Sequence, residues 1–414
     1  MAKKNKCRLK CLILTVVILG AIAIVLATRV EWNGFDTTIP GIWEGDDLFP
    51  VPLVNRVTDE IVLASEQNVT YGTGGANQDV EFYRNGAYDC GLTGEYTFIV
   101  LNPKNSDAQD EAPLWVYLHG GGSGYWDEEG NYFALYEQDE DAFNHEETFD
   151  DHIGTVTARL TNADGEMMDN TFTRRRSEGY RMLVVSMCDH DQYLGMGSPY
   201  PNNPTNPNAE VNGLQATMSA IDYTVANYPT THVFVHGTSA ASAGAYAVGM
   251  SYAAEGIALS GVISDSILGS RATIIQSELS GEPGFPQQWG YDSAQVSAKV
   301  GPWRDEDNRL FPEDRFGEGL ETPNLQIGGS LDPSCAGEFD PLPEAVADGF
   351  GNNCAWTAQP LIDLIADQPE SPHEVVLIKG EGHIPTITEG TSHDIVDAFI
   401  KRALKKNPDP PFKR

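Results

Sequence analysis

Short apolar runs alternate with helical patterns along this chain, and that alternation constrains the fold more than any other feature. Seven β-branched or aliphatic runs lie between turn signals, at residues 96–101, 114–118, 181–186, 232–236, 261–264, 325–328 and 375–378. Several are unbroken, which is typical of strands covered on both faces. Helical patterns are clearest at 211–226, 240–254 and 392–405. This predicts an α/β fold, a mostly parallel sheet with helices on both faces and reactive loops at the carboxyl ends of the strands.

The N-terminus reads as a membrane-targeting segment. Five Lys or Arg residues lie within the first ten positions, and no charge follows from position 11 until Arg29. An apolar run of this length predicts an uncleaved anchor, with its basic end in the cytoplasm and the rest outside. Val25-Leu26-Ala27 could instead be a cleavage site, which would release a secreted protein. We expect segment 1–30 to meet the membrane, 31–60 to form a stalk, 61–407 to form one α/β domain and 408–414 to be a tail.

The body of the chain is strongly acidic. Residues 1–30 and 401–414 each hold six Lys or Arg, which leaves 14 bases against 59 acids over residues 31–400, a net charge of −45. Such a surface repels nucleic acid and anionic lipid, so nucleic-acid binding is excluded. Solubility explains the charge without a cationic partner. The sequence does not predict an oligomeric state.

An acidic insertion at residues 125–151 holds eleven acids together with aromatic residues such as Trp126. It directly follows a glycine-rich loop, so it could be a lid or a substrate-binding flap that uses Trp126. A solvated surface excursion packed by its own aromatic residues is the alternative. The twelve-residue pattern of a calcium loop is not present.

A cluster of very small residues joins the apolar run 232–236 to the helical pattern at 240–254. The sequence there is Gly237-Thr238-Ser239-Ala240-Ala241-Ser242-Ala243-Gly244. A nucleophilic serine needs a strained turn that exposes its oxygen, with small neighbours two positions away on either side because strand and helix backbones approach closely. Gly237 fits the first of these positions, and Ala241 stands where glycine is usual. This predicts Ser239 as the nucleophile, with Ser242 as the competitor.

A glycine-rich loop, His119-Gly120-Gly121-Gly122-Ser123-Gly124, follows the apolar run 114–118. Bare backbone N–H groups suit an oxyanion that develops during acyl transfer. We expect Gly121, Gly122 and Ala240 to supply them. A flexible turn or a phosphate-binding nest is the alternative, although the Lys-Ser or Lys-Thr of a Walker loop is missing.

Asp332 and His383 each follow an apolar run, at the positions where an acid and a base are needed. A serine hydroxyl requires an imidazole to take its proton and a carboxylate to orient that imidazole. The chain order Ser239, Asp332, His383 is that of α/β hydrolases. Asp265, which ends the run 261–264, is a rival acid, whereas His119 and His236 read as structural.

Two further features concern Asp189 and the cysteines. Asp189-His190-Asp191 resembles a metal cluster, but adjacent ligands rarely converge on one ion, so we expect no metal and assign Asp189 to the substrate cleft. Cys335 with Cys354 is the expected disulfide of an exported chain, and the pairing of Cys90 and Cys188 stays open.

The motifs resemble those of the pectin acetylesterase family, which includes the Notum-type carboxylesterases, within the α/β-hydrolase superfamily. The resemblance rests on His119-Gly120-Gly121-Gly122, on Gly237-Thr238-Ser239-Ala240, on Cys188-Asp189, and on the order and spacing of Asp332 and His383. The matching motifs are islands between about residues 95 and 390. The resemblance implies hydrolysis of acyl esters, including acetyl esters on polysaccharide, by a serine mechanism with no metal or cofactor. A peptidase or lipase on the same scaffold, or an inactive surface binding protein, is the alternative.

Overall fold

The computed structural model describes residues 56–72, 77–90, 94–103, 108–121, 124–126, 132–134, 145–199, 210–266, 316, 320–332, 353–388 and 392–412. The chain divides into two units, Met1–Leu48 and Phe49–Arg414, and these residues all belong to the second. The membrane segment expected at 1–30 lies outside them. Within the described ranges, no helix is both long enough and apolar enough to span a bilayer.

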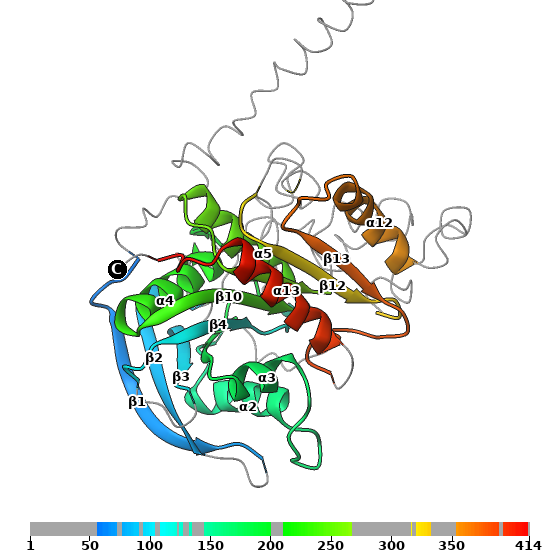
Figure 1. The fold of residues 1–414 in the computed structure, drawn as a ribbon. Helices are drawn as coiled ribbons and strands as arrows, with labels where there is room; N and C mark the ends of the chain where they lie inside the picture. Colours follow the sequence, from blue (N-terminus) through cyan, green and yellow to red (C-terminus); the bar gives the residue numbers. More distant parts are fainter. Residues whose placement is uncertain are drawn as a thin grey trace, which may run out of the picture. The chain divides into compact units, whose positions relative to one another are not determined.

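The described elements alternate between strands and helices (Figure 1). They are β1 (Ile61–Thr70), β2 (Asn77–Asp89), β3 (Glu95–Leu101), β4 (Ala112–Leu118), β5 (Gly124–Trp126), β6 (Tyr132–Ala134), α2 (Phe149–Leu160), α3 (Thr171–Ser177), β7 (Arg181–Val185), β8 (Ser198–Pro199), β9 (Glu210–Val211), α4 (Gly213–Asn227), β10 (Thr230–Thr238), α5 (Ala241–Ala254), β11 (Gly261–Asp265), β12 (Asn324–Gly329), α12 (Asn353–Ala366), β13 (Glu374–Ile378) and α13 (Ser392–Lys406). Each of the seven strands and three helices expected from the sequence has its counterpart here.

The described strands form a sheet in the order β1-β2-β3-β7-β4-β10-β11-β12-β13. From β7 to β13 every neighbouring pair is parallel, while β1, β2 and β3 add to the sheet in antiparallel fashion. The architecture is therefore a mixed α/β sheet. β1 and β2 were not predicted. β1 begins with the apolar residues Ile61-Val62-Leu63-Ala64, but most of its side chains are exposed and its second half is polar, so no sustained pattern marks that edge strand.

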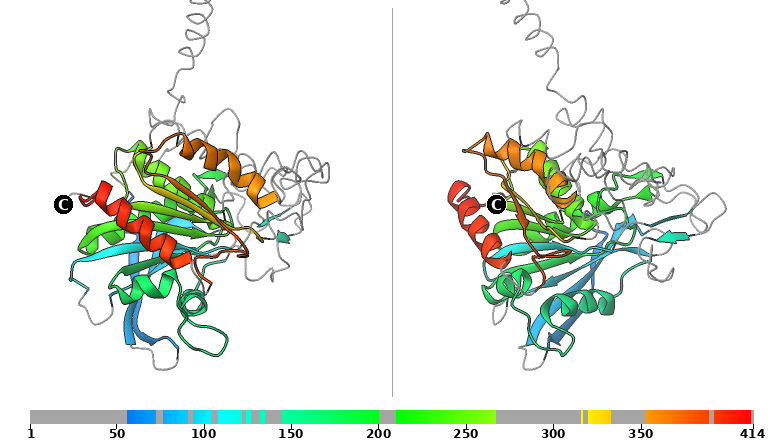
Figure 2. Two further views of the ribbon diagram at one scale, coloured as in Figure 1. Left: turned by 45° about the vertical axis from the view of Figure 1, so that its right-hand side comes forward. Right: turned by 90° about the vertical axis from the view of Figure 1, so that its right-hand side faces the viewer.

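Helices cover both faces of the sheet. α2, α3 and α13 share a core with one face, in which Trp115, Phe234 and Phe399 are buried. α4 and α5 contact each other and the strands at the centre of the sheet, and α12 contacts β13. Figure 2 shows α12 and α13 on opposite sides of the strands β12 and β13. This double cover explains why the central strands are unbroken apolar runs.

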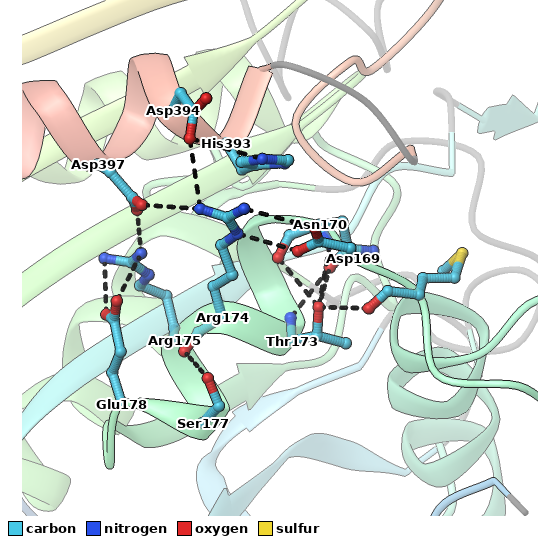
Figure 3. A network of polar contacts seen from close by, with 11 residues as sticks. Asp169, Asn170, Thr173, Arg174, Arg175, Ser177, Glu178, His393, Asp394 and Asp397 are labelled. Atoms are coloured by element: carbon cyan, nitrogen blue, oxygen red, sulfur yellow. Dashed lines mark hydrogen bonds and ion pairs between the residues drawn. The ribbon is translucent and has the colours of Figure 1, made fainter.

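Ion pairs fasten α13 to α3 (Figure 3). Arg174 Nη1 lies 3.1 Å from the carboxylate of Asp397, and Arg175, whose side chain is almost completely buried, pairs with the same carboxylate. α13 follows the loop that carries His383, so these contacts fix the far end of that loop.

The stalk expected at 31–60 ends earlier than predicted. Arg56 is buried, with its guanidinium 2.7 Å from Asp222 of α4 and 2.9 Å from Glu255, which caps α5. Residues from 56 onward are therefore part of the α/β body.

Strand register brings the ends of distant segments to one edge of the sheet. Gly237 of β10 pairs with Leu118 of β4, and Thr238 pairs with Asp265 of β11. Gly329 of β12 pairs with Ile378 of β13. The loops that follow these strands therefore emerge side by side, and they carry the residues predicted to react.

Candidate active site

Ser239 occupies a sharp turn between β10 and α5. Its φ angle is 55°, in the left-handed region that non-glycine residues rarely adopt. Its backbone N–H donates to the carbonyl oxygen of Asp265 at 2.9 Å, which holds the turn against β11. A Cβ on Gly237 would lie 2.0 Å from the carbonyl oxygen of Ala241, so only glycine fits at 237. The turn has the strained form that an exposed nucleophile requires.

Ser242, the alternative nucleophile, is inaccessible. Its side chain is 1% exposed, whereas Ser239 is partly exposed. The Ser242 hydroxyl has no hydrogen-bond partner among the described residues, so no base is in place to activate it. Nearby, Gly244 allows close approach of the backbone of Gln192, which explains the glycine at that position.

Ser239, His383 and Asp332 lie in series. His383 Nε2 is 2.7 Å from Ser239 Oγ, and His383 Nδ1 is 2.9 Å from Asp332 Oδ2. A carboxylate accepts only, so the Nδ1–H donates to Asp332 and leaves Nε2 to accept the serine proton. Asp332 and His383 come from the loops after β12 and β13, the strands that neighbour each other at this edge. Sequence reasoning thus chose three residues that the fold brings into contact.

The environment makes His383 more basic than a free histidine. Burial alone would lower its pKa, but the hydrogen bond and charge of Asp332, together with the charge of Asp265, outweigh burial and raise it. A raised pKa suits a group that must hold a proton during the reaction. Ser266, which the sequence analysis did not single out, places its hydroxyl 3.5 Å from His383 Nδ1 and has a φ angle of 115°.

Asp265, the rival acid, lies at the same edge but serves another group. Its Oδ2 accepts from the backbone N–H of Thr386 at 3.0 Å and also from the Thr386 hydroxyl. It therefore fixes the segment three residues beyond His383, and no hydrogen bond joins it to the imidazole among the contacts of the described residues.

The glycine-rich loop lies directly against the serine. A Cβ on Gly120 would be 2.6 Å from Ser239 Cβ and 3.3 Å from Ser239 Oγ, so a side chain cannot be accommodated there. Gly121 follows, backed by Met187 and His190. Ala240 precedes α5, where backbone N–H groups lack helical partners. Ala240 follows Ser239 in the chain, and Gly121 follows the residue that lies against Ser239. Gly122 lies outside the described residues.

Glu147, from the acidic insertion, is a second residue near the site that sequence reasoning missed. Its carboxylate oxygens lie 3.2 and 3.3 Å from His119 Nε2, and one of them accepts from the backbone N–H of Met187 at 2.7 Å. Burial would raise the pKa of Glu147, but His119 and the other neighbours lower it to about 2. One buried acid among eleven gives no signal in composition; only its place just before α2 could have suggested it.

The structure does not support the role expected for Asp189. We expected it to line the substrate cleft, yet it is fully buried, and its Oδ2 accepts from the Tyr96 hydroxyl at 2.7 Å and from the Asn212 N–H at 2.9 Å. Asp191 accepts from the Gly213 N–H at 2.9 Å. Both carboxylates satisfy backbone groups at the start of α4. Among the described residues, no cluster of three or more His, Cys, Asp or Glu side chains could hold a metal ion.

The remaining predicted residues are only partly described. Trp126 ends the short strand β5, and its side chain lies outside the described part of the chain, so its role in a substrate-binding flap stays a prediction. Cys335 lies outside the described residues, so its predicted pairing with Cys354 stays a prediction. Cys90 and Cys188, which the sequence left open, form a disulfide with Cα atoms 5.7 Å apart. It joins the end of β2 to the loop after β7, the loop that backs Gly121.

No protein-family model and no curated protein matches the chain. Similar solved structures include a glucuronoyl esterase from Solibacter usitatus (11% identity, 89% of this chain and 91% of that one, TM-score 0.47). Another is an S-formylglutathione hydrolase from Agrobacterium tumefaciens (10% identity, 82% and 99%, TM-score 0.45). A third is Est1E from Butyrivibrio proteoclasticus (15% identity, 76% and 96%, TM-score 0.37). At such low similarity, the functional conclusion rests on the contacts within this chain.

Proposed function

We propose that this chain is a serine esterase of the α/β-hydrolase type, with Ser239 as nucleophile, His383 as general base and Asp332 as the orienting acid. One observation carries the proposal: a partly exposed serine on a strained turn lies 2.7 Å from an imidazole whose other nitrogen meets a buried carboxylate at 2.9 Å. The chain order Ser, Asp, His also supports it.

The proposed reaction has two halves. Ser239 Oγ attacks the ester carbonyl carbon while its proton passes to His383 Nε2. The tetrahedral intermediate collapses as the bond to the alcohol oxygen breaks, and the alcohol leaves with the proton from His383. Water then attacks the acyl-serine and gives a proton to His383. Release of the carboxylic acid returns that proton to Ser239.

The N–H groups of Gly121 and Ala240 are the proposed donors to the oxyanion, with Gly122 as a further one. The position of Gly120 against Ser239 supports this, because it places the loop beside the attacked carbonyl. Each such donor contributes about 10²- to 10³-fold in turnover.

The proposed substrates are small acyl esters, including acetyl esters on polysaccharide, met outside the cytoplasm by an anchored or secreted enzyme. Support for the substrate comes from the motif resemblance to pectin acetylesterases, and support for the location from the basic and apolar N-terminus. A panel of acetyl, long-acyl and peptide substrates distinguishes this proposal from a lipase or a peptidase.

The central test is Ser239→Ala assayed on p-nitrophenyl acetate. We expect kcat to fall on the order of 10⁴- to 10⁶-fold, because no other hydroxyl contacts His383 Nε2 among the described residues. A fluorophosphonate should label the wild type and not this variant. The matched control is Ser242→Ala, which removes a buried hydroxyl three residues away and should keep full activity. Equal activity of both variants would refute the assignment, and a wild type inert to every ester and probe would indicate a binding protein.

A further inference from the structure

We infer that His119 and Glu147 are a positioning pair that holds the Gly120–Gly121 peptide so that the Gly121 N–H faces the carbonyl attacked by Ser239. The inference rests on the proposed function and deepens it. Neither residue touches the substrate; both act through the peptide.

Hydrogen bonding defines the state of the His119 ring. Nδ1 lies 3.0 Å from the carbonyl oxygen of Gly120, and Nε2 lies 3.2 Å from the nearer carboxylate oxygen of Glu147. Both partners are acceptors, so both ring nitrogens donate only when the ring is an imidazolium. Glu147 thus keeps Nδ1 protonated, and Nδ1 binds the Gly120 carbonyl.

Peptide planarity carries this orientation to the reacting centre. The carbonyl of Gly120 and the N–H of Gly121 belong to one trans peptide, so they point in opposite directions. A ring that binds the carbonyl on one side therefore turns the N–H to the other. Glycine flanks this peptide on both sides, so little else restrains its rotation.

A flipped peptide would be costly at this position. Gly120 lies so close to Ser239 that its missing Cβ would meet the serine Oγ at 3.3 Å. Rotation would remove a donor from the oxyanion and present a carbonyl oxygen to it instead. The orientation therefore matters more for turnover than for substrate binding.

Glu147 is anchored independently of His119. It accepts the Met187 N–H after β7, and its own carbonyl accepts the Thr97 hydroxyl of β3 at 2.8 Å. Two neighbouring strands of the sheet, β3 and β7, are thus linked to this residue, just before α2. A buried ion pair often adds no net stability to a fold. The presence of the His119–Glu147 pair at this position therefore favours a role in orienting the Gly120–Gly121 peptide.

The charges around His119 favour the imidazolium. Burial and Arg159 of α2 lower the pKa of His119, but the charge and hydrogen bond of Glu147 and the bond to Gly120 outweigh them, and the pKa is raised. His152, on the other side of Glu147, has a pKa of about 4 because it is buried, so it stays neutral. The ring of Tyr193 lies edge to face with the His119 ring, with 6.3 Å between the ring centroids. Burial raises the pKa of Tyr193, so its hydroxyl stays protonated.

The test compares His119→Leu, His119→Asn and Glu147→Gln with the wild type on p-nitrophenyl acetate. Leucine removes both bonds, whereas the asparagine amide can still donate to the Gly120 carbonyl from the position of Nδ1. We expect kcat to fall between about 10- and 100-fold in His119→Leu, with KM within about 3-fold, and to recover partly in His119→Asn. His373→Phe, which replaces a buried histidine at the opposite end of β13, is the control and should match the wild type.

A trifluoromethyl ketone measures the oxyanion site directly, because its adduct with serine carries the same charged oxygen. Its affinity should weaken in parallel with kcat in His119→Leu. Unchanged kcat, or a loss in kcat with unweakened ketone binding, would overturn the inference while Ser239→Ala still upheld the esterase. If His119→Leu fails to fold by circular dichroism, Glu147→Gln decides the question by the same two readouts.

The pH dependence of kcat distinguishes a positioning role of His119 from a purely structural one, because a structural role would leave this dependence unchanged. When His119 loses its proton at high pH, the Gly120 carbonyl loses its donor, so kcat should fall on an alkaline limb. Glu147→Gln removes the charge that raises the pKa of His119, so this limb should move to lower pH. The acid limb, set by His383, should stay in place. An alkaline limb that does not move in Glu147→Gln would contradict the inference.

Discussion

Asp265 ends β11 and Asp332 follows the neighbouring parallel strand β12, and both are almost completely buried, yet their carboxylates bind different groups. Asp332 meets the imidazole at 2.9 Å, while Asp265 binds Thr386 beyond it. The comparison shows that burial at the same edge of the sheet does not by itself make an aspartate the partner of the histidine. What decides the role is the point along the histidine loop that each carboxylate reaches.

The electrostatic surroundings of Asp265 agree with its contact to Thr386. Burial raises the pKa of Asp265 to about 7, and the two hydrogen bonds from Thr386 only partly oppose it. Its Oδ1 has no hydrogen-bond partner among the described residues. Asp265 therefore keeps its proton to higher pH than an ordinary aspartate, and its hydrogen bonds go to the loop and not to the imidazole.

The largest expected effect comes from Asp332→Asn. Without the carboxylate, the imidazole loses its orientation and adopts the wrong tautomer, so kcat on p-nitrophenyl acetate should fall on the order of 10⁴-fold. The acid limb should move to lower pH, since Asp332 raises the pKa of His383. Asp265→Asn is the matched control and should cost less than about 10-fold. If kcat fell more in Asp265→Asn than in Asp332→Asn, Asp265 and not Asp332 would be the acid that orients His383.

The next effect concerns stability and Asp265→Asn. An acid whose pKa is about 7 in the folded chain against 3.8 ordinarily binds its proton more tightly when folded. Wild-type stability should therefore fall relative to the variant as pH rises from about 4 to about 7, by at most about 1.4 kcal/mol per pH unit. Urea unfolding of both proteins across that window measures the difference. A difference that does not change with pH would show that Asp265 titrates normally.

The smallest effect is expected from Thr386→Val. Valine keeps the shape and the backbone N–H but removes the hydroxyl that binds Asp265 and lies 2.9 Å from His236 Nε2. We expect a loss of about 1–2 kcal/mol in unfolding free energy. Thr386→Ser retains the hydroxyl and should lose less. Identical stability of the two variants would mean that the hydroxyl does not hold the loop.

Much of the fold was predictable from local patterns. Each of the seven apolar runs predicted between residues 96 and 378 corresponds to a strand, and the helical pattern at 240–254 corresponds to α5 (Ala241–Ala254). β1 was missed because it lies at the edge of the sheet, where most side chains are exposed. Its apolar start at Ile61-Val62-Leu63 is followed by polar residues, so neither an alternating nor a continuous apolar pattern extends along the strand. α3 was missed because its seven residues include three arginines and too few apolar positions for a period.

The candidate site shows the same division. Ser239 carries a local signal, since its turn demands small neighbours whatever the rest of the chain does. Asp189 misled us because a polar cluster after a strand looks alike whether it faces a cleft or caps a buried helix start. Glu147 gave no signal, because its partners His119 and Met187 lie 28 and 40 residues away.

By itself the sequence determined the alternating strands and helices, the strained serine turn, the glycine loop and the order of serine, acid and base. Each depends on short-range sterics or on the burial of nearby side chains. Only the tertiary structure decided that Asp332 and not Asp265 meets His383, that Asp189 is buried against the start of α4, and that Glu147 contacts His119. Those outcomes depend on strand register and loop paths, which bring together atoms far apart in the chain and which no local pattern encodes.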